Sequence, residues 1–110
     1  MKYYVDIDGT ICDTAPHDRD SDTFPDYMDS VPIVDRIKQI NALYDAGHEI
    51  HYWTARGTVS GIDWLDQTID QLDEWGVRYN TIATGKPDYD IWIDDKAREA
   101  KVYFDELTSE

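Results

Sequence analysis

Short apolar runs alternate along this chain with longer segments in which apolar residues recur at helical spacing. The short runs predict strands at Lys2–Asp6, Glu49–Trp53, Val77–Ile82 and Tyr89–Ile93, with a further edge strand at Val102–Phe104. The longer segments predict helices from Pro32 to Gly47 and from Ile62 to Trp75, and a short helix through Ala100. This alternation indicates a Rossmann-like α/β fold, a three-layer sandwich whose mostly parallel sheet is covered on both faces.

Length and charge narrow the classes of function. A chain of 110 residues suits one domain with one core, so residues 1–110 are expected to form a single domain. The net charge of −14 disfavours nucleic acid, because such a surface needs clustered Lys and Arg and the ten basic residues are scattered. A small substrate is therefore the expected partner.

The expected location is the cytoplasm. Cys12 is the single cysteine and cannot form an internal disulfide, which favours a reducing compartment. No apolar segment is long enough to span a membrane, and a strand directly after Met1 leaves no room for a secretory leader. The sequence does not decide whether the protein forms a homo-oligomer, because aromatic residues such as Tyr27 and Trp64 could serve a subunit contact or the core.

Two pairs of acidic residues follow apolar runs. Asp6 and Asp8 are two apart on an extended segment, so their side chains face the same way, and Gly9 allows a sharp exit from the strand. Asp94 and Asp95 end another apolar run. If these strand ends are neighbours, four carboxylates crowd together, which is tolerable around a cation such as Mg²⁺.

Two further polar residues are expected at the same edge of the sheet. Thr54 follows the second predicted strand and Lys86 precedes the fourth, and ligands of open α/β sheets bind beyond the carboxyl ends of the strands. Phosphoryl transfer needs an attacking carboxylate, a metal that offsets charge, and fixed donors for the phosphoryl oxygens. These residue types supply each of those parts.

The order of the motifs resembles the haloacid dehalogenase superfamily of phosphotransferases. The motifs span residues 6 to 95: Asp6-Ile7-Asp8-Gly9-Thr10, Tyr52-Trp53-Thr54-Ala55-Arg56-Gly57, Gly85-Lys86-Pro87 and Ile93-Asp94-Asp95. The resemblance implies a phosphatase or mutase rather than a dehalogenase, because an acid stands at Asp8. It is greatest to small phosphatases without a cap domain that are linked to sugar-phosphate and surface-polysaccharide metabolism.

The same resemblance implies a role for each site residue. Asp6 would form an aspartyl-phosphate, and Asp8 would first protonate the leaving oxygen and then activate water. Thr54 and Lys86 would hold the phosphoryl group. The expected substrate contacts are Gly9, Thr10, Ala55 and Arg56, and the expected Mg²⁺ ligands are Asp6, Asp8 through its main-chain carbonyl, Asp94 and, next in line, Asp95.

The gaps between motifs leave no room for a cap domain, so the acidic stretch 13–30 is expected to form a flap over the active site. Its residues Asp18, Asp20, Asp22 and Asp29 also have part of the spacing of a calcium loop, but Thr23 stands where such a loop needs Gly.

Structural and functional alternatives remain at this stage. Asp6 and Asp8 could form a turn and helix cap, as could Thr54 or Asp95 for the helices after them. Lys86 could be an ordinary loop lysine, and Arg56 could pair with the acidic stretch. The functional alternatives are a nucleotide or nucleic-acid-end phosphatase, and a non-catalytic module that binds phosphate or metal.

Overall fold

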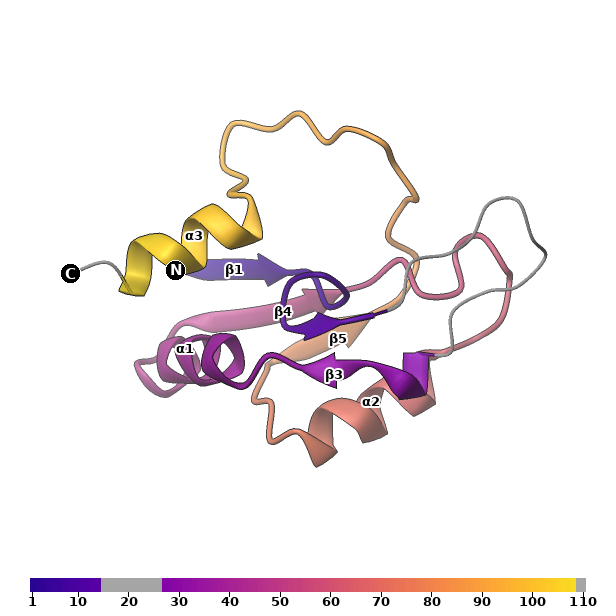
Figure 1. Cartoon of the computed structure of the whole chain (residues 1–110), viewed down its shortest axis with the longest axis horizontal. Coiled ribbons are helices and arrows are strands. Elements are labelled where there is room, and N and C mark those ends of the chain that lie inside the picture. The colour runs from indigo at the N-terminus through magenta and orange to yellow at the C-terminus, as the bar shows by residue number, and fades with distance from the viewer. Residues whose placement is uncertain (15–26, 109–110) are drawn as a thin grey trace.

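A parallel three-stranded sheet forms the centre of the molecule (Figure 1). A computed structural model describes residues 1–14 and 27–108. The strands are β1 (Lys2–Val5), β4 (Glu49–Trp53) and β5 (Thr81–Ala83), in the order β1-β4-β5. Val5 pairs with Tyr52, which in turn pairs with Ile82, so the three strands end at one edge of the sheet. The prediction of a parallel α/β sheet is confirmed.

The helices between the strands follow the predicted spacing of apolar residues. Helix α1 (Val34–Asp45) joins β1 to β4, and α2 (Leu65–Glu74) joins β4 to β5. Both start later than predicted: Pro32 belongs to a strand, and Asp63 accepts the Leu65 N–H at the first turn of α2. Each ends before a glycine with positive φ, Gly47 and Gly76, a conformation that a side chain disfavours.

A small antiparallel ladder brackets the acidic stretch. Strand β2 (Cys12–Asp13) pairs with β3 (Val31–Pro32), and a 3₁₀ turn, η1 (Tyr27–Asp29), precedes β3. The ladder therefore holds the two ends of the stretch 13–30 together, and its expected role as a flap stays a prediction. Residues 15–26, with the partial calcium-loop spacing, lie outside the described residues.

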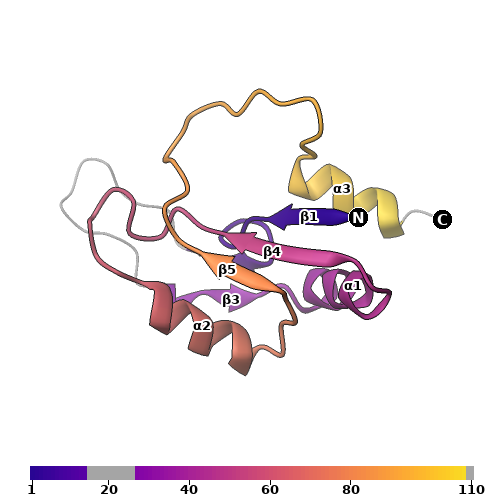
Figure 2. The ribbon, with the colours of Figure 1, turned by 180° about the vertical axis from the view of Figure 1, so that it is seen from behind.

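The C-terminal third departs from prediction in several places: the strand expected at Val77–Ile82 begins only at Thr81, and the helix expected through Ala100 begins only at that residue. Tyr89–Ile93 is not a strand; segment 84–99 arcs away from β1, and Ile93 is 92% exposed (Figure 1, Figure 2). Val102–Phe104 is likewise not a strand but part of helix α3 (Ala100–Thr108). The Glu99 carboxylate accepts the N–H groups of Lys101 and Val102, which caps this helix and decides against an extended conformation.

One cluster of buried side chains forms the core. Ile37 and Ile40 of α1, Leu72 of α2 and Phe104 of α3 pack with the sheet face that carries Val5, Ile50 and Tyr52. The opposite face carries alternate residues such as Tyr4, which is 72% exposed and stacks on His51. The expected second covering layer is thus not found among the described residues, and no helix in them is long and apolar enough to cross a membrane.

Ile40 tests this account of the core. It is 1% exposed on α1, so Ile40→Ala removes buried methyl groups and leaves a cavity that should cost about 2–5 kcal/mol of unfolding free energy. Urea denaturation followed by circular dichroism measures the change. The control Val34→Ala, at a position 54% exposed on the same helix, should change stability by less than about 0.5 kcal/mol. Equal effects at the two positions would contradict this core.

Candidate active site

The candidate site lies at the carboxyl edge of the sheet, where the three strands end together. Asp6 and Asp8 follow β1, Thr54 follows β4, and Lys86 lies three residues after β5. Backbone hydrogen bonds link the turn after β4 to the turn after β5. The Thr54 N–H donates to the Ala83 carbonyl at 3.0 Å, and the Lys86 N–H donates to the Thr54 carbonyl at 3.1 Å. The structure therefore brings these four predicted residues to one edge.

Asp6 is a partly buried carboxylate that faces a lysine. Lys86 Nζ lies 3.5 Å from Asp6 Oδ1, and the Thr10 hydroxyl donates to Oδ2 at 3.4 Å. Burial raises the pKa of Asp6 above its ordinary value, and the charge of Lys86 offsets part of that rise. The side chain remains 35% exposed, which leaves the carboxylate accessible to a small molecule.

The turn after β1 uses its own backbone donors. Gly9 adopts φ +78°, and its N–H donates to the Cys12 carbonyl at 2.8 Å. The Thr10 N–H donates to the Ile7 carbonyl at 3.1 Å. Both N–H groups are thus engaged inside the turn, and substrate binding by Gly9 and Thr10 stays a prediction.

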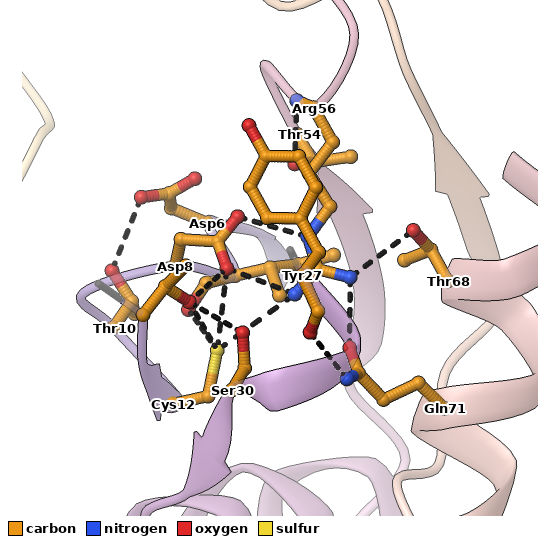
Figure 3. Close-up of polar contacts among 12 residues, drawn as sticks. Asp6, Asp8, Thr10, Cys12, Tyr27, Ser30, Thr54, Arg56, Thr68 and Gln71 are labelled. Carbon is orange, nitrogen blue, oxygen red and sulfur yellow. Dashed lines mark hydrogen bonds and ion pairs between the residues drawn. The ribbon is translucent and has the colours of Figure 1, made fainter. Parts of the chain in front are cut away.

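Asp8 is held by an arginine from the turn after β4 (Figure 3). Arg56 Nε donates to Asp8 Oδ2 at 2.9 Å and Nη2 to Oδ1 at 2.8 Å, a two-point contact between the guanidinium and both carboxylate oxygens. The Arg56 side chain is 0% exposed and that of Asp8 is 25% exposed. Arg56 therefore pairs with a residue of the site itself, and its predicted direct contact with substrate is not favoured by this geometry.

The same contacts shift the ionisation of Asp8. Burial alone would raise its pKa, but the hydrogen bonds and charge of Arg56, with hydrogen bonds from Thr14 and Cys12, outweigh burial and lower the pKa below its ordinary value. Asp6 and Asp8 are thus shifted in opposite directions. Cys12 is buried below them; burial and the charge of Asp8 raise the pKa of its thiol to about 11, which suits a packing role.

Several residues around Asp8 carried no signal in the sequence. The Thr14 hydroxyl donates to Asp8 Oδ1 and lies 2.7 Å from the Ser30 hydroxyl, across the β2–β3 ladder. On the far side of Arg56, Thr68 and Gln71 of α2 accept hydrogen bonds from Nη1. These residues lie far apart in the sequence and belong to no motif, so only the fold identifies them.

Thr54 and Ala55 shape the turn that carries Arg56. Thr54 is 1% exposed, and its hydroxyl accepts the Arg56 N–H at 3.1 Å, while the Ala55 carbonyl accepts the Thr58 N–H. Thr54 therefore caps this turn rather than a helix, since α2 begins only at Leu65. Its expected contact with a phosphoryl group stays a prediction.

Asp94 and Asp95 are not assembled with Asp6 in this structure. Asp94 is exposed on segment 84–99, where its carboxylate accepts hydrogen bonds from Lys96 N–H at 2.8 Å and Trp92 Nε1–H at 3.3 Å. These hydrogen bonds lower the pKa of Asp94. Carboxylates suit Mg²⁺ chemically, yet within residues 1–14 and 27–108 no three Asp, Glu, His or Cys side chains gather closely enough to hold an ion. In this arrangement the donors do not form a complete metal site.

An open cleft of about 1120 Å³ connects the two acidic pairs. Asp6 and Lys86 lie in its wall, as do Asp94 and Asp95 from segment 84–99. Aromatic residues complete this part of the lining: Trp53, Tyr89 and Trp92. Trp92 packs edge-on against both other rings, and Lys86 Nζ lies 5.4 Å from the centroid of the Tyr89 ring, which links this aromatic group to the candidate site.

Comparisons with known proteins support the fold and name no activity. No family model and no curated protein matches the sequence. A crystal structure of a target protein from Vibrio cholerae is similar, with a TM-score of 0.76 and 28% identity over 98% of this chain and 94% of that one. The chain thus shares its overall fold with that protein along nearly the full length of both.

The raised pKa of Asp6 predicts how Asp6→Asn changes stability. A raised pKa means that the folded state binds the proton more tightly, so the wild type loses stability as the pH rises from the ordinary value of 3.8 through the folded-state pKa. Asn avoids this loss. In urea denaturation with EDTA, Asp6→Asn should therefore be more stable than the wild type at pH 7, and the gain should vanish below pH 3.8.

The control for this prediction is Asp70→Asn on the exposed face of α2. It reports the general effect of removing one negative charge from a chain of net charge −14, and its gain at pH 7 should be smaller. A gain for Asp6→Asn no larger than that of Asp70→Asn would contradict the assignment of Asp6 as a partly buried carboxylate with a raised pKa.

Proposed function

We propose that this protein is a Mg²⁺-dependent phosphomonoester hydrolase that works through an aspartyl-phosphate on Asp6. The observation that carries the proposal is the Asp6–Lys86 pair, with Nζ 3.5 Å from Oδ1, in the wall of an open cleft at the carboxyl edge of a parallel sheet. An accessible carboxylate beside a fixed cation suits attack on an electron-rich phosphorus, because the cation attracts the phosphoryl oxygens.

The proposed reaction has two steps. An Asp6 oxygen attacks phosphorus and the bond to the leaving oxygen breaks, so that the phosphoryl group passes to Asp6. Water then attacks the aspartyl-phosphate, releases inorganic phosphate and restores the Asp6 carboxylate. Lys86 compensates charge on the phosphoryl oxygens in both steps, with Thr54 as the expected second donor.

Asp8 is the proposed acid in the first step and base in the second. The contacts from Arg56 favour the ionised form of Asp8, which is the form that the base requires. The acid role requires a proton on Asp8 when the ester arrives. The geometry therefore supports the base role more directly.

The Mg²⁺ requirement rests on the pattern of acidic residues. Asp6, the Asp8 carbonyl, Asp94 and Asp95 would supply hard oxygen ligands, and a bound ion would offset negative charge during phosphoryl transfer. Asp94 and Asp95 share the cleft with Asp6, which supports the ligand set, although they do not meet it in the described arrangement.

The proposed substrate is a small phosphorylated metabolite such as a sugar phosphate. The net charge of −14 disfavours polyanions, and Trp53, Tyr89 and Trp92 offer apolar surfaces beside the Asp6–Lys86 pair. The single buried cysteine is consistent with a cytoplasmic location, which we also propose.

Asp6→Asn tests the proposed nucleophile. An amide does not form the aspartyl-phosphate, so the variant should show no turnover of 4-nitrophenyl phosphate in Mg²⁺, measured by release of nitrophenolate. Asp70→Asn should keep the wild-type rate. An Asp6→Asn protein that turns over at the wild-type rate would remove Asp6 as nucleophile.

A substrate panel separates the alternatives. We expect the wild type to hydrolyse sugar phosphates with a higher kcat/KM than nucleotides or DNA ends, and EDTA should abolish the activity. Preference for nucleotides would identify the nucleotide phosphatase instead. Phosphate binding without hydrolysis of any ester in Mg²⁺ would identify the non-catalytic module.

A further inference from the structure

We infer that Arg56 is a positioning residue that orients Asp8 for its role as base; this inference rests on the proposed phosphatase function. Its basis is a buried network in which one guanidinium joins the loop after β1 to helix α2 (Figure 3).

The contact between Arg56 and Asp8 defines one orientation of the carboxylate. Nε and Nη2 each donate to a different oxygen, at 2.9 and 2.8 Å, so the two planar groups face each other and Asp8 cannot rotate without losing a hydrogen bond. Thr14 adds a third hydrogen bond, to Oδ1. The Asp8 carboxylate is therefore fixed relative to the Asp6 backbone two residues earlier.

The side of the guanidinium that faces away from Asp8 is also fixed by hydrogen bonds. Nη1 donates to Thr68 Oγ1 at 3.2 Å and to Gln71 Oε1 at 2.8 Å, and Nη2 also lies 4.0 Å from Cys12 Sγ. Four N–H groups of Arg56 thus donate to oxygen acceptors in the described structure, and the fifth has only the Cys12 sulfur as a weak, distant acceptor. Because the side chain is also 0% exposed, it offers no accessible donor to a phosphoryl oxygen, which argues against direct substrate binding.

Helix α2 and η1 hold this arrangement from outside. The Tyr27 ring covers the guanidinium, with Arg56 Cζ 4.7 Å from the ring centroid. The Gln71 side-chain amide in turn donates to the Tyr27 carbonyl at 2.7 Å. Rotation of Arg56 would break contacts with three separate elements. The fold therefore fixes the position of Arg56, and Arg56 in turn fixes the orientation of the Asp8 carboxylate.

This rigidity matters for the second step of the proposed reaction. A base must lie within hydrogen-bond reach of the water that attacks phosphorus, and a displacement of about 1 Å costs on the order of 10²-fold in rate. With a good leaving group the first step needs no acid. The consequence of a misplaced Asp8 is then confined to hydrolysis of the aspartyl-phosphate.

The test compares wild type, Arg56→Lys and the control Arg78→Lys with 4-nitrophenyl phosphate in Mg²⁺. Lysine keeps the positive charge but cannot hold both carboxylate oxygens. Arg78 forms an exposed ion pair with Asp45 away from the site, which makes it a matched control. In this two-step reaction, kcat/KM reports the steps up to transfer to Asp6, and kcat reports hydrolysis of the intermediate wherever that step limits turnover.

We expect Arg56→Lys to lower kcat by roughly 10²-fold while kcat/KM stays nearly unchanged, so that KM falls in parallel. A burst of nitrophenolate, close to one equivalent of enzyme, should precede the slow steady state. Arg78→Lys should match the wild type in both constants.

Other outcomes overturn the inference. Equal loss of kcat and kcat/KM would indicate a purely structural role, and a raised KM at constant kcat would indicate direct substrate binding. A wild type without turnover would refute the proposed function and the inference together, whereas an active wild type with an unchanged Arg56→Lys refutes the inference alone.

Thr68→Val provides the test if Arg56→Lys does not fold. It keeps the shape of a fully buried side chain on α2 and removes the hydroxyl that accepts a hydrogen bond from Arg56 Nη1. The expected result is a smaller fall in kcat with kcat/KM unchanged. A Thr68→Val protein with wild-type kcat, or with equal loss in both constants, would overturn the inference.

Discussion

The ion pair between buried Arg56 and partly buried Asp8 joins the parts of the molecule that surround the candidate site. Its members lie 48 positions apart, and their contacts connect the loop after β1, the turn after β4, helix α2 and η1. Loss of Asp8 would leave the buried charge of Arg56 uncompensated, a change that typically costs about 3–5 kcal/mol. The pair is thus a strong constraint on how the loops pack above the sheet.

This constraint divides two neighbouring carboxylates into different roles. Asp8 is enclosed by donors and favoured in its ionised form, whereas Asp6 faces the cleft with one lysine beside it and a raised pKa. Opposite shifts within one turn are typical of sites that need one group to react and another to move protons. A turn and helix cap would not require this arrangement, since within residues 1–14 and 27–108 neither carboxylate accepts an N–H group of a helix.

The sequence predicted the parts of the fold that depend on local periodicity. Strand β4 matches its prediction from Glu49 to Trp53, and α1 and α2 follow the spacing of their buried residues. The strand predicted at Tyr89–Ile93 does not form, because an apolar run needs a neighbouring strand to pair with as well as suitable side chains. Val102–Phe104 failed because capping by Glu99 outweighed the preference of three residues.

The candidate site was predicted only in part, because local patterns do not reveal contacts between segments that lie far apart in the sequence. Asp6, Asp8 and Thr54 were predictable because each follows an apolar run that forms a strand. Lys86 was expected before a fourth strand that does not form, and it reaches the site from the turn after β5 instead. The role of Arg56 was not predictable from the sequence, because its partners Thr68 and Gln71 come close to it only when α2 packs against the sheet. The meeting of Asp94 with Asp6 depended on the strand that did not form.

The central claim is that Asp6 receives the phosphoryl group, and trapping that group tests it most directly. Enzyme mixed with 4-nitrophenyl phosphate and Mg²⁺, quenched rapidly in acid, digested and analysed by mass spectrometry, should carry one phosphoryl group on the peptide that contains Asp6. Turnover with the phosphoryl group on another residue would contradict the account.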